Sequence, residues 1–589
     1  MNRIYAFLLA VVSGLFCIQC TPQEQPQTPG ENTEQAGGLK PSAILRKVEV
    51  HTDKSCYAPG EQVSFTADRV PGGYVVRYWH LGDVLKEEPF SSETWTWTPP
   101  ADDFKGYFVE IVGMDKDGHE KTMGAVAVDV SSDWTRFPRY GFLTQFGNVS
   151  EGMMTSVLEN LKNYHINAMQ YYDWMLDHHK PLAGTAENPD LDWINLISKT
   201  CYKSTVEGYI NRGHDYGIAS MFYDLCYGAL AWAAEDGVKE EWYVYKDRSH
   251  SEKDYHPLDG MFKSSIWVLD PSNEEWLDYL ADNIDDVYAV YDFDGFHIDQ
   301  LGDRGRRYDY NGVEINMHDG YGKFINWMDA RNPEKKHAFN AVSRSGQPQI
   351  AAANTDFLYN EVWTTGFKEI KGIIDQNYGL APEKNSVLAA YMNYNKNPKS
   401  GDFNTPAVLL MDAVTFSLGG AHLELGEHML CSEYFPATNL AMDKELQECL
   451  PCYYDFLVGY ENLLRDGAAY VDVNVSSEDM NLKEYGPVQG AVNYFVKRKD
   501  NLTMIHLLNF TDATHLDWRD DSYSQAEPRE VTDVVISMRS AANVKKVWVA
   551  SPDVNGGIPS EVTPKKGALS ISIPVPYLKY WTMVVVETE

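Results

Sequence analysis

The chain has 589 residues, of which 44% are hydrophobic and 13% aromatic, and this is enough apolar material for about two to four folded domains. Asp and Glu outnumber Lys and Arg by 85 to 50, and the net charge of −35 disfavours nucleic acid and anionic membrane surfaces as partners. A neutral ligand is compatible with this charge.

The N-terminus is typical of a bacterial signal peptide. Arg3 precedes an apolar run at 4–18, which is shorter than the roughly 20 residues of a membrane-spanning helix. Cys20 follows this run and resembles the lipidated cysteine of a lipoprotein. Residues 21–40 are rich in Pro, Gln, Glu, Thr and Gly, which predicts a flexible tether. We therefore expect 1–20 to direct the protein to the bacterial cell envelope, where a lipid on Cys20 is its only membrane attachment; an ordinary secreted protein is the alternative.

Short strand-like runs alternate with turn signals in residues 41–132. Runs such as QVSFTA and KGYFVEIVG place apolar residues at every second position, and Pro, Gly and Asp separate the runs. Strands of this length and spacing predict an immunoglobulin-like β-sandwich.

In residues 133–468 the pattern changes to strand-like runs separated by amphipathic helical ones, which is typical of a parallel sheet. Eight such strands are expected, at 139–146, 166–174, 218–224, 293–299, 337–343, 356–363, 385–394 and 414–425. Eight units predict a (β/α)8 TIM barrel, whose active site lies at the carboxyl ends of the strands. Long inserts at 175–215 and 225–265 are expected to shape access to that site.

Residues 469–589 return to strands, such as AVNYFVKRK and LTMIHLLNF, and predict an antiparallel β-sandwich. We expect this C-terminal domain to pack on the barrel, and nothing in its sequence indicates a part in catalysis. The predicted fold is therefore a multidomain one, with a central barrel and a β-sandwich on either side of it in the chain.

No pattern indicates a metal or a cofactor. Beyond residue 20 the chain has six cysteines, too few and too scattered for a disulfide framework. The C-x-x-C at 449–452 lacks a second pair, and the H-x-E-x-x-E-H at 422–428 lacks the helical H-E-x-x-H spacing. We therefore expect neither a metal nor a cofactor.

Acidic and aromatic residues gather at the ends of the predicted barrel strands. The acidic ones are Asp173, Asp224, Asp299, Glu361 and Glu424. The aromatic ones are Tyr171, Tyr172, Trp174, Tyr223, Tyr359 and Trp363. Aromatic faces stack on sugar rings, and carboxylates transfer protons and stabilise an oxocarbenium-like transition state, so this combination predicts a sugar-cleaving site. The alternative is that the aromatic residues fill the barrel and the acids pair with arginines.

Several long motifs resemble glycoside hydrolase family 66 and follow one another in the order of that family. They are RYGF at 139–142, INAMQYYDWMLDHHKP at 166–181, FDGFHIDQLGDRG at 293–305, LYNEVW at 358–363 and GGAHLELGEHML with CSEYFP at 419–436. The family comprises endo-dextranases and cycloisomaltooligosaccharide glucanotransferases. The resemblance spans the predicted barrel, and the flanking sandwiches also match the family's architecture.

The resemblance implies that Asp299 is the nucleophile and Glu361 the general acid/base of a retaining mechanism on α-1,6-linked glucan. It also implies that Asp173 is needed for activity, through contacts with substrate hydroxyls. Further substrate contacts are expected from Tyr172, Trp174, Tyr223, His297, Trp363 and Glu424. Retention needs the two carboxyls about 5 to 5.5 Å apart. Tyr359 and Trp363 are expected to raise the pKa of Glu361 by limiting its solvation.

These observations predict an enzyme that hydrolyses internal α-1,6 linkages of dextran to isomaltooligosaccharides. The cyclising members of the family carry an additional carbohydrate-binding module within the barrel region, and no such insert is visible between residues 135 and 465, which favours hydrolysis over transglycosylation. A non-catalytic glycan-binding lipoprotein would have lost a catalytic carboxylate, and both are present. An α-amylase-like enzyme shares only the D-G-F-x-x-D strand.

Overall fold

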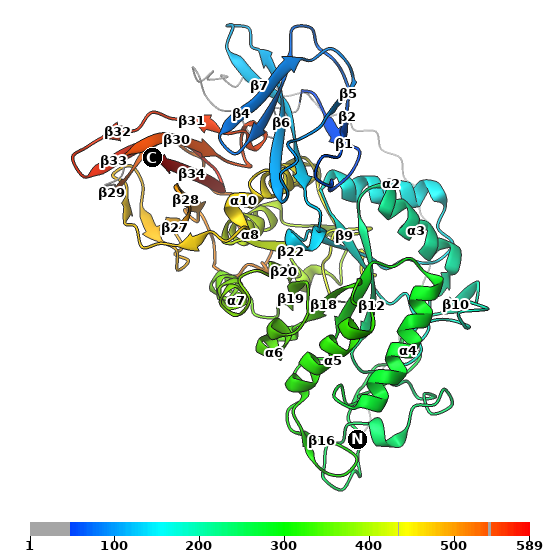
Figure 1. The fold of residues 1–589 in the computed structure, drawn as a ribbon. Coiled ribbons are helices and arrows are strands. Elements are labelled where there is room, and N and C mark those ends of the chain that lie inside the picture. The colour runs from blue at the N-terminus through cyan, green and yellow to red at the C-terminus, as the bar shows by residue number, and fades with distance from the viewer. Residues whose placement is uncertain (1–46, 434, 540–542) are drawn as a thin grey trace, which may run out of the picture. The chain divides into compact units, whose positions relative to one another are not determined.

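A parallel sheet of eight strands lies in the middle of the chain (Figure 1). The computed structural model describes residues 47–433, 435–539 and 543–589. The predicted signal peptide, the tether and Cys20 lie outside the described residues. Among the residues that are described, no helix has both the length and the apolar character needed to cross a membrane.

The eight strands pair in chain order and nearly close into a barrel. They are β8 (Tyr140–Leu143), β9 (Ala168–Tyr171), β12 (Ala219–Leu225), β15 (Gly295–Asp299), β18 (Lys336–Asn340), β19 (Phe357–Glu361), β20 (Ser386–Ala389) and β22 (Gly420–Leu423). The last strand meets the first where the Phe142 amide donates to the Leu425 carbonyl at 3.2 Å. A Cβ on Gly426 would lie 2.3 Å from the Phe142 carbonyl oxygen, so this approach requires glycine. The predicted barrel is confirmed.

The eighth strand was predicted to begin at residue 414, which is six residues before it begins in the structure. Val414–Leu418 form the end of helix α8 (Thr405–Leu418), and the strand starts only at Gly420. Nearly every residue of α8 is buried, so its sequence has no polar face and its apolar run reads like a buried strand. Gly419, at φ 101°, ends the helix in the left-handed conformation that glycine adopts without strain.

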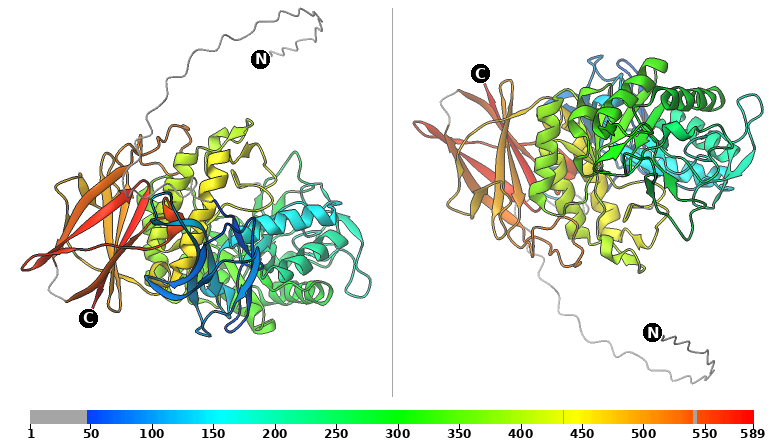
Figure 2. Two further views of the ribbon diagram at one scale, coloured as in Figure 1. Left: turned by 90° about the horizontal axis from the view of Figure 1, so that it is seen from above. Right: turned by 90° about the horizontal axis from the view of Figure 1, so that it is seen from below.

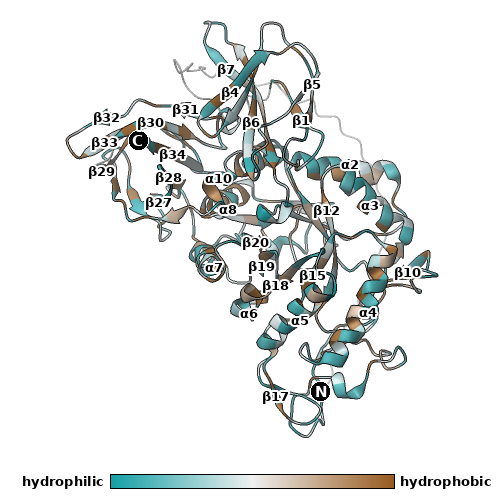
Figure 3. Ribbon diagram, in the orientation of Figure 1, coloured by the Kyte–Doolittle hydropathy of each residue, from teal (hydrophilic) through white to brown (hydrophobic). Residues whose placement is uncertain are grey.

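Helices pack around the barrel sheet (Figures 1 and 2). Besides α8 they are α2 (Glu151–Asn163), α3 (Lys203–Asp215), α4 (Glu274–Val290), α5 (Met317–Arg331), α6 (Gln347–Ala352), α7 (Phe367–Leu380), α9 (Lys444–Gly459) and α10 (Glu461–Leu464). Helix α4 is amphipathic, as its mixed colouring in Figure 3 shows. The Asn273 side chain caps it by accepting from the amides of Glu275 and Trp276, and Trp276, Leu280 and Ile284 are buried along one face. Each such side chain contributes about 1.5 to 3 kcal/mol relative to exposure.

Two sheets precede the barrel and share one hydrophobic cluster. One contains β1 (Val50–Thr52), β2 (Val63–Ala67) and β5 (Thr94–Trp97); the other contains β3 (Val75–His80), β4 (Asp83–Pro89), β6 (Lys105–Met114) and β7 (Glu120–Val130). Strand β7 is joined to the barrel by a fully buried ion pair, 2.6 Å between Arg139 Nη2 and Asp129 Oδ2. The Ala127 amide also donates to Asp455 of α9 at 2.8 Å.

Two further sheets follow the barrel and enclose a separate hydrophobic cluster. The larger contains β24 (Ala469–Tyr470), β26 (Leu482–Glu484), β27 (Val492–Lys499), β28 (Leu502–Asn509), β30 (Val544–Ala550), β31 (Ser560–Glu561) and β34 (Trp581–Thr588). The smaller contains β25 (Val475–Ser476), β29 (Val531–Arg539), β32 (Lys565–Lys566) and β33 (Ser570–Leu578). The larger sheet packs on the barrel, where Lys497 Nζ donates to the Leu418 carbonyl at 2.7 Å.

Short ribbons occupy the inserts at the carboxyl ends of the barrel strands. They are β10 (Asp192–Ile194) with β11 (Thr200–Tyr202), β13 (Tyr255–His256) with β14 (Ile266–Trp267), β16 (Arg307–Tyr308) with β17 (Glu314–Ile315), and β21 (Gly401–Asp402) with β23 (Leu440–Ala441). The inserts after β9 and β12 supply Leu196, Leu258, Phe262 and Ile266 to the wall of the cavity described below.

Candidate active site

A cavity of about 270 Å³ lies at the carboxyl ends of the barrel strands. Its polar lining includes Gln170, Asp173, His178, His297, Asp299, Gln300, Asn340, Glu361 and Glu433. Its aromatic lining includes Tyr172, Tyr223, Tyr359, Trp363, Tyr391 and Phe435. A larger hollow of about 560 Å³ lies at the opposite ends of β18 and β19 and is lined by charged residues such as Lys336 and Asp356. Its lining does not combine carboxylates with aromatic rings as the first cavity does. The smaller cavity is therefore the candidate active site.

One asparagine joins the two candidate catalytic carboxylates. Asp299, Asn340 and Glu361 are the last residues of three neighbouring strands, β15, β18 and β19. Asn340 Nδ2 donates to Asp299 Oδ1 at 2.8 Å and to Glu361 Oε2 at 3.3 Å. The two acceptor oxygens therefore lie no more than about 6 Å apart, which is below the 6.5 to 9.5 Å range of inverting glycosidases.

The surroundings of these two carboxyl groups differ. Burial raises the pKa of Glu361 to about 7, and the negative charge of Asp299 adds to this effect. Burial also raises the pKa of Asp299, but the Gln300 amide, the Tyr223 hydroxyl and Asn340 all donate to its carboxylate and oppose the rise. These donors favour an ionised Asp299 beside a protonated Glu361, the division of roles that a nucleophile and an acid need.

The Tyr391 hydroxyl donates to Glu361 Oε1 at 2.7 Å, which stabilises the carboxylate and opposes the rise in its pKa that burial causes. Tyr391→Phe removes this donor, and we expect the pKa of Glu361 to rise by about 0.5 to 1 unit. Glu361 would then keep its proton to a higher pH, so the alkaline limb of the kcat/KM profile should move upward. Tyr216→Phe is the matched control, because the Tyr216 hydroxyl donates to Glu159, and neither residue lines the cavity. A limb that stays in place or moves downward would contradict this role.

Two further polar side chains, those of Asp173 and His178, lie near Asp299 in the cavity lining. Asp173 follows β9 with φ 52°, a left-handed conformation that Asp tolerates better than most residues, and burial raises its pKa to about 7. The His178 ring donates through Nδ1 to the fully buried Asp224 at 2.6 Å, and His178 lines the cavity. The charge of His178 lowers the pKa of both Asp173 and Asp299. His178 was not among the predicted site residues, although it lies within the motif at 166–181.

The structure brings together most of the residues predicted for the site. Asp299, Glu361, Asp173, Tyr172, Tyr223, His297 and Trp363 all line the cavity. Burial lowers the pKa of His297 to about 3, so this imidazole is neutral at the floor of the site. Their roles in catalysis and substrate binding stay predictions.

Two predicted substrate contacts are wrong. Trp174 is 0% exposed and packs against Phe222, Tyr291 and Phe293, because the chain turns at Asp173 and directs the next side chain into the core. Glu424 is also 0% exposed. It accepts from the Tyr454 hydroxyl of α9 at 2.9 Å, outside the cavity.

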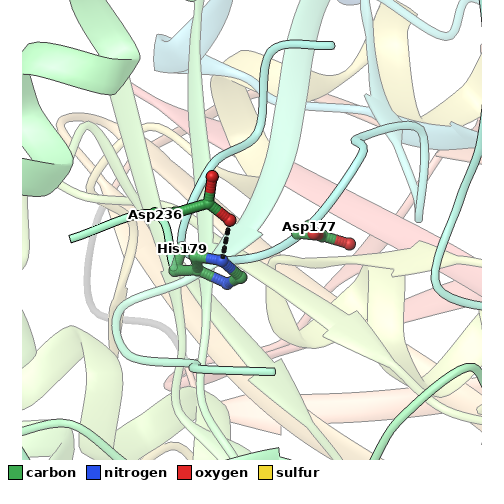
Figure 4. Close-up of side chains that lie close together, drawn as sticks. All are labelled: Asp177, His179 and Asp236. Atoms are coloured by element: carbon green, nitrogen blue, oxygen red, sulfur yellow. Dashed lines mark hydrogen bonds and ion pairs between the residues drawn. The ribbon is translucent and has the colours of Figure 1, made fainter. Parts of the chain in front are cut away.

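Two groups of His and acidic side chains among the described residues are close enough to hold a metal ion. In the first, His179 Nε2 lies 3.1 Å from Asp236 Oδ2, and a carboxylate oxygen of Asp177 lies within 4.8 Å of both residues (Figure 4). Lys263 already pairs with Asp177 at 3.1 Å and Lys180 with Asp236 at 2.9 Å. These lysines supply the positive charge that a metal would bring, so the charges of both carboxylates are balanced by lysines.

The second group, Asp412, His422 and Glu424, is fully buried between β22 and the helices. His422 Nε2 donates to the Ala390 carbonyl at 2.8 Å, and His422 Nδ1 lies 2.8 Å from Asp412 Oδ1. Burial raises the pKa of both carboxyls well above their usual range, which favours neutral acids that need no cation. This group is an internal polar cluster that lies apart from the cavity.

The sequence profile of Glycosyl hydrolase family 66 matches residues 52–585, which include every strand of the barrel and nearly all of both flanking sets of sheets. The chain belongs to glycosyl hydrolase family 66. Its relatives include a cycloisomaltooligosaccharide glucanotransferase of Niallia circulans, 26% identical over 99% of this chain and 75% of that protein. They also include a dextranase of Streptococcus salivarius, 24% identical over 82% of this chain and 68% of that protein.

A solved structure has this fold. It is the crystal structure of cycloisomaltooligosaccharide glucanotransferase from Paenibacillus sp. complexed with cycloisomaltoheptaose, and it superposes with a TM-score of 0.84 over 93% of this chain and 99% of that one. At 24% identity, the likeness establishes the family fold alone.

Proposed function

We propose that this family 66 protein is a retaining endo-dextranase that hydrolyses internal α-1,6-glucosidic linkages of dextran. The observation that carries the proposal is the pair Asp299 and Glu361, held within about 6 Å by Asn340 at the end of the barrel. The dextranase and glucanotransferase relatives support the same substrate class. Aromatic side chains around the pair would stack on glucose rings.

In the first step, an Asp299 oxygen attacks the anomeric carbon and forms an ester bond while the glycosidic bond breaks. The proton of Glu361 goes to the leaving oxygen. In the second step, the Glu361 carboxylate takes a proton from water, the water oxygen attacks the anomeric carbon and the ester bond breaks. Two displacements at one carbon return the α configuration.

An alternative is intramolecular transglycosylation to cyclic isomaltooligosaccharides, as the names of two relatives indicate for those proteins. This chain covers 75% of the length of the first of them. Between β8 and α10, the described residues form the barrel, its helices and short two-stranded ribbons, with no additional sandwich. The lack of an inserted sandwich among these described residues supports hydrolysis over transglycosylation.

The test is incubation of the protein lacking residues 1–20 with dextran, followed by assay of reducing ends and product size. Rising reducing ends with short linear isomaltooligosaccharides would establish the dextranase. Cyclic products with few reducing ends would establish the glucanotransferase. Dextran binding without turnover would contradict both, and NMR of the first products should show the α anomer if the mechanism is retaining.

We also propose that the protein is anchored to the bacterial cell envelope through a lipid on Cys20 and that its flanking sheets are β-sandwiches, the first of immunoglobulin type. The sequence of residues 1–40 supports the anchor. Metabolic labelling with an alkyne fatty acid should mark the wild-type protein and leave Cys20→Ser unmarked. Equal labelling of the two proteins would contradict the assignment of Cys20.

A further inference from the structure

The loop between β28 and β29, residues 511–526, reaches from the C-terminal sheets to the active site; we call it the C-terminal loop. Trp518 is fully buried, its amide donates to the Thr365 carbonyl at 2.7 Å, and its indole donates to the Thr364 carbonyl at 2.8 Å. These threonines follow Trp363, which lines the cavity. The loop is thus attached to the segment that carries the candidate acid/base.

Asp520 fixes the conformation of the C-terminal loop. It is fully buried with φ 48°, and one of its carboxylate oxygens accepts from the Ser524 amide at 2.8 Å and from His515 at 3.0 Å. Beyond β20, the Asn393 amide donates to the Arg519 carbonyl at 2.7 Å, and the Asn393 side chain donates to the Asp520 carbonyl at 2.9 Å. Two segments of the barrel therefore hold the loop in place.

In this position the side chain of Arg519 contacts two aromatic rings, those of Trp363 and Tyr394. Arg519 is 6% exposed, and its guanidinium carbon lies 5.5 Å from the ring centre of Trp363 and 5.2 Å from that of Tyr394. Its Nη2 donates at 3.2 Å to the carbonyl of Val362, the residue between Glu361 and Trp363. The guanidinium thereby fixes both the indole ring and the backbone that joins it to the acid/base.

The side chains that contact Asp299 and those that contact Glu361 define two parts of the cavity. Around Asp299 lie the polar groups of Tyr223, His178 and Asp173. On the Glu361 side, Tyr391 is hydrogen-bonded to the Glu361 carboxyl and Trp363 lies 5.6 Å from Tyr391, while Tyr394, which is not part of the cavity lining, lies 5.9 Å from Trp363. A sugar that becomes bonded to Asp299 must occupy the first part. The sugar that receives the proton of Glu361 must then lie in the second, against Trp363.

We propose that Arg519 is a positioning residue that holds Trp363 as the platform for the leaving-group sugar. This inference rests on the proposed function and deepens it. After the first sugar has left, the same platform receives either water or a second sugar as the acceptor. Arg519 therefore sets the affinity for long α-1,6-glucan and the ratio of transfer to hydrolysis, although it belongs to the C-terminal domain.

The test compares Arg519→Ala with wild type on dextran and on α-isomaltosyl fluoride, whose small leaving group leaves the Trp363 platform empty. With dextran, KM should rise about 3- to 30-fold and the share of transfer products should fall. With the fluoride, kcat/KM for hydrolysis should stay within about twofold. Arg529→Ala is the matched control, because Arg529 ends the same region and pairs with Asp512 on the surface.

A double-mutant cycle separates positioning from a loss of folding. Trp363→Ala should raise KM for dextran as Arg519→Ala does, and the double variant should be no worse than Trp363→Ala alone. Equal losses on both substrates in Arg519→Ala, or additive losses in the cycle, would overturn the role of Arg519. A wild-type protein without turnover of dextran would instead contradict the proposed function, so the two failures are distinct.

Discussion

Replacing Asp299 by Asn should lower kcat/KM for dextran by about 10⁴-fold or more, because an amide cannot form the covalent intermediate. The variant should fold normally, since the amide oxygen can still accept from Gln300 and Asn340 while the amide nitrogen donates to the Tyr223 hydroxyl oxygen. Release of reducing ends measures the loss. Asp303→Asn is the matched control: this exposed carboxylate in the following loop accepts only a local bond from the Gly305 amide, and its replacement should change kcat/KM by less than about twofold.

Azide can identify the function of Asp299 more sharply than loss of activity. In Asp299→Ala the space of the carboxylate is open, so azide can attack α-isomaltosyl fluoride from the opposite face. The product should be the β-glycosyl azide, with turnover restored in proportion to azide. An α-glycosyl azide from this variant would show that another group forms the covalent intermediate. Dextran turnover by Asp299→Asn at the wild-type rate would contradict the assignment outright.

The barrel and its two carboxylates could be predicted from the sequence because they depend on local patterns. A buried parallel strand is an apolar run, and the first polar residue after it lies at the active end of a barrel. Asp299 and Glu361 both end their strands in this way. The same rule points to Asn340, the last residue of β18, which follows the Ile298–Phe339 register pair as Asp299 does on β15. A neutral amide, however, lacks the chemical signal that marks a carboxylate.

The wrong predictions have a physical cause in the backbone. Period-two alternation holds only within a strand, and β9 ends at Tyr171. Asp173 then adopts a left-handed conformation that no pattern of residue types specifies, and Trp174 falls in the core. Glu424 lies just past the end of β22, and it contacts a tyrosine of α9 that is 30 residues away in the chain.

The contribution of the C-terminal loop was also beyond the reach of sequence patterns. Trp518 and Thr364 are separated by 154 residues, and nothing local in either segment indicates the other. The sequence of the C-terminal domain indicated no part in catalysis, whereas the structure places Arg519 on Trp363. Long-range contacts of this kind depend on how whole domains dock, which periodicity does not describe.

Replacing Glu361 by Gln should affect the two steps of the reaction differently. With dextran, the leaving sugar needs a proton, so kcat/KM should fall about 10²- to 10⁴-fold. With α-isomaltosyl fluoride, fluoride leaves without a proton and the first step should survive. The second step lacks its base, so the glycosyl-enzyme on Asp299 should accumulate and be visible by mass spectrometry of the intact protein. Azide needs no base and should release it as the α-glycosyl azide.

The pH profile provides an independent test of Glu361. Its pKa is raised to about 7, so the acid form needed for the first step is present below that pH and is lost above it. The wild-type kcat/KM for dextran should therefore fall as pH rises through about 7, and Glu361→Gln should lack this alkaline limb. A variant that keeps the limb, or cleaves dextran as fast as wild type, would assign the proton to another group. Because Asp299 must be ionised in the free enzyme for attack, the acid limb of the kcat/KM profile should remain in Glu361→Gln.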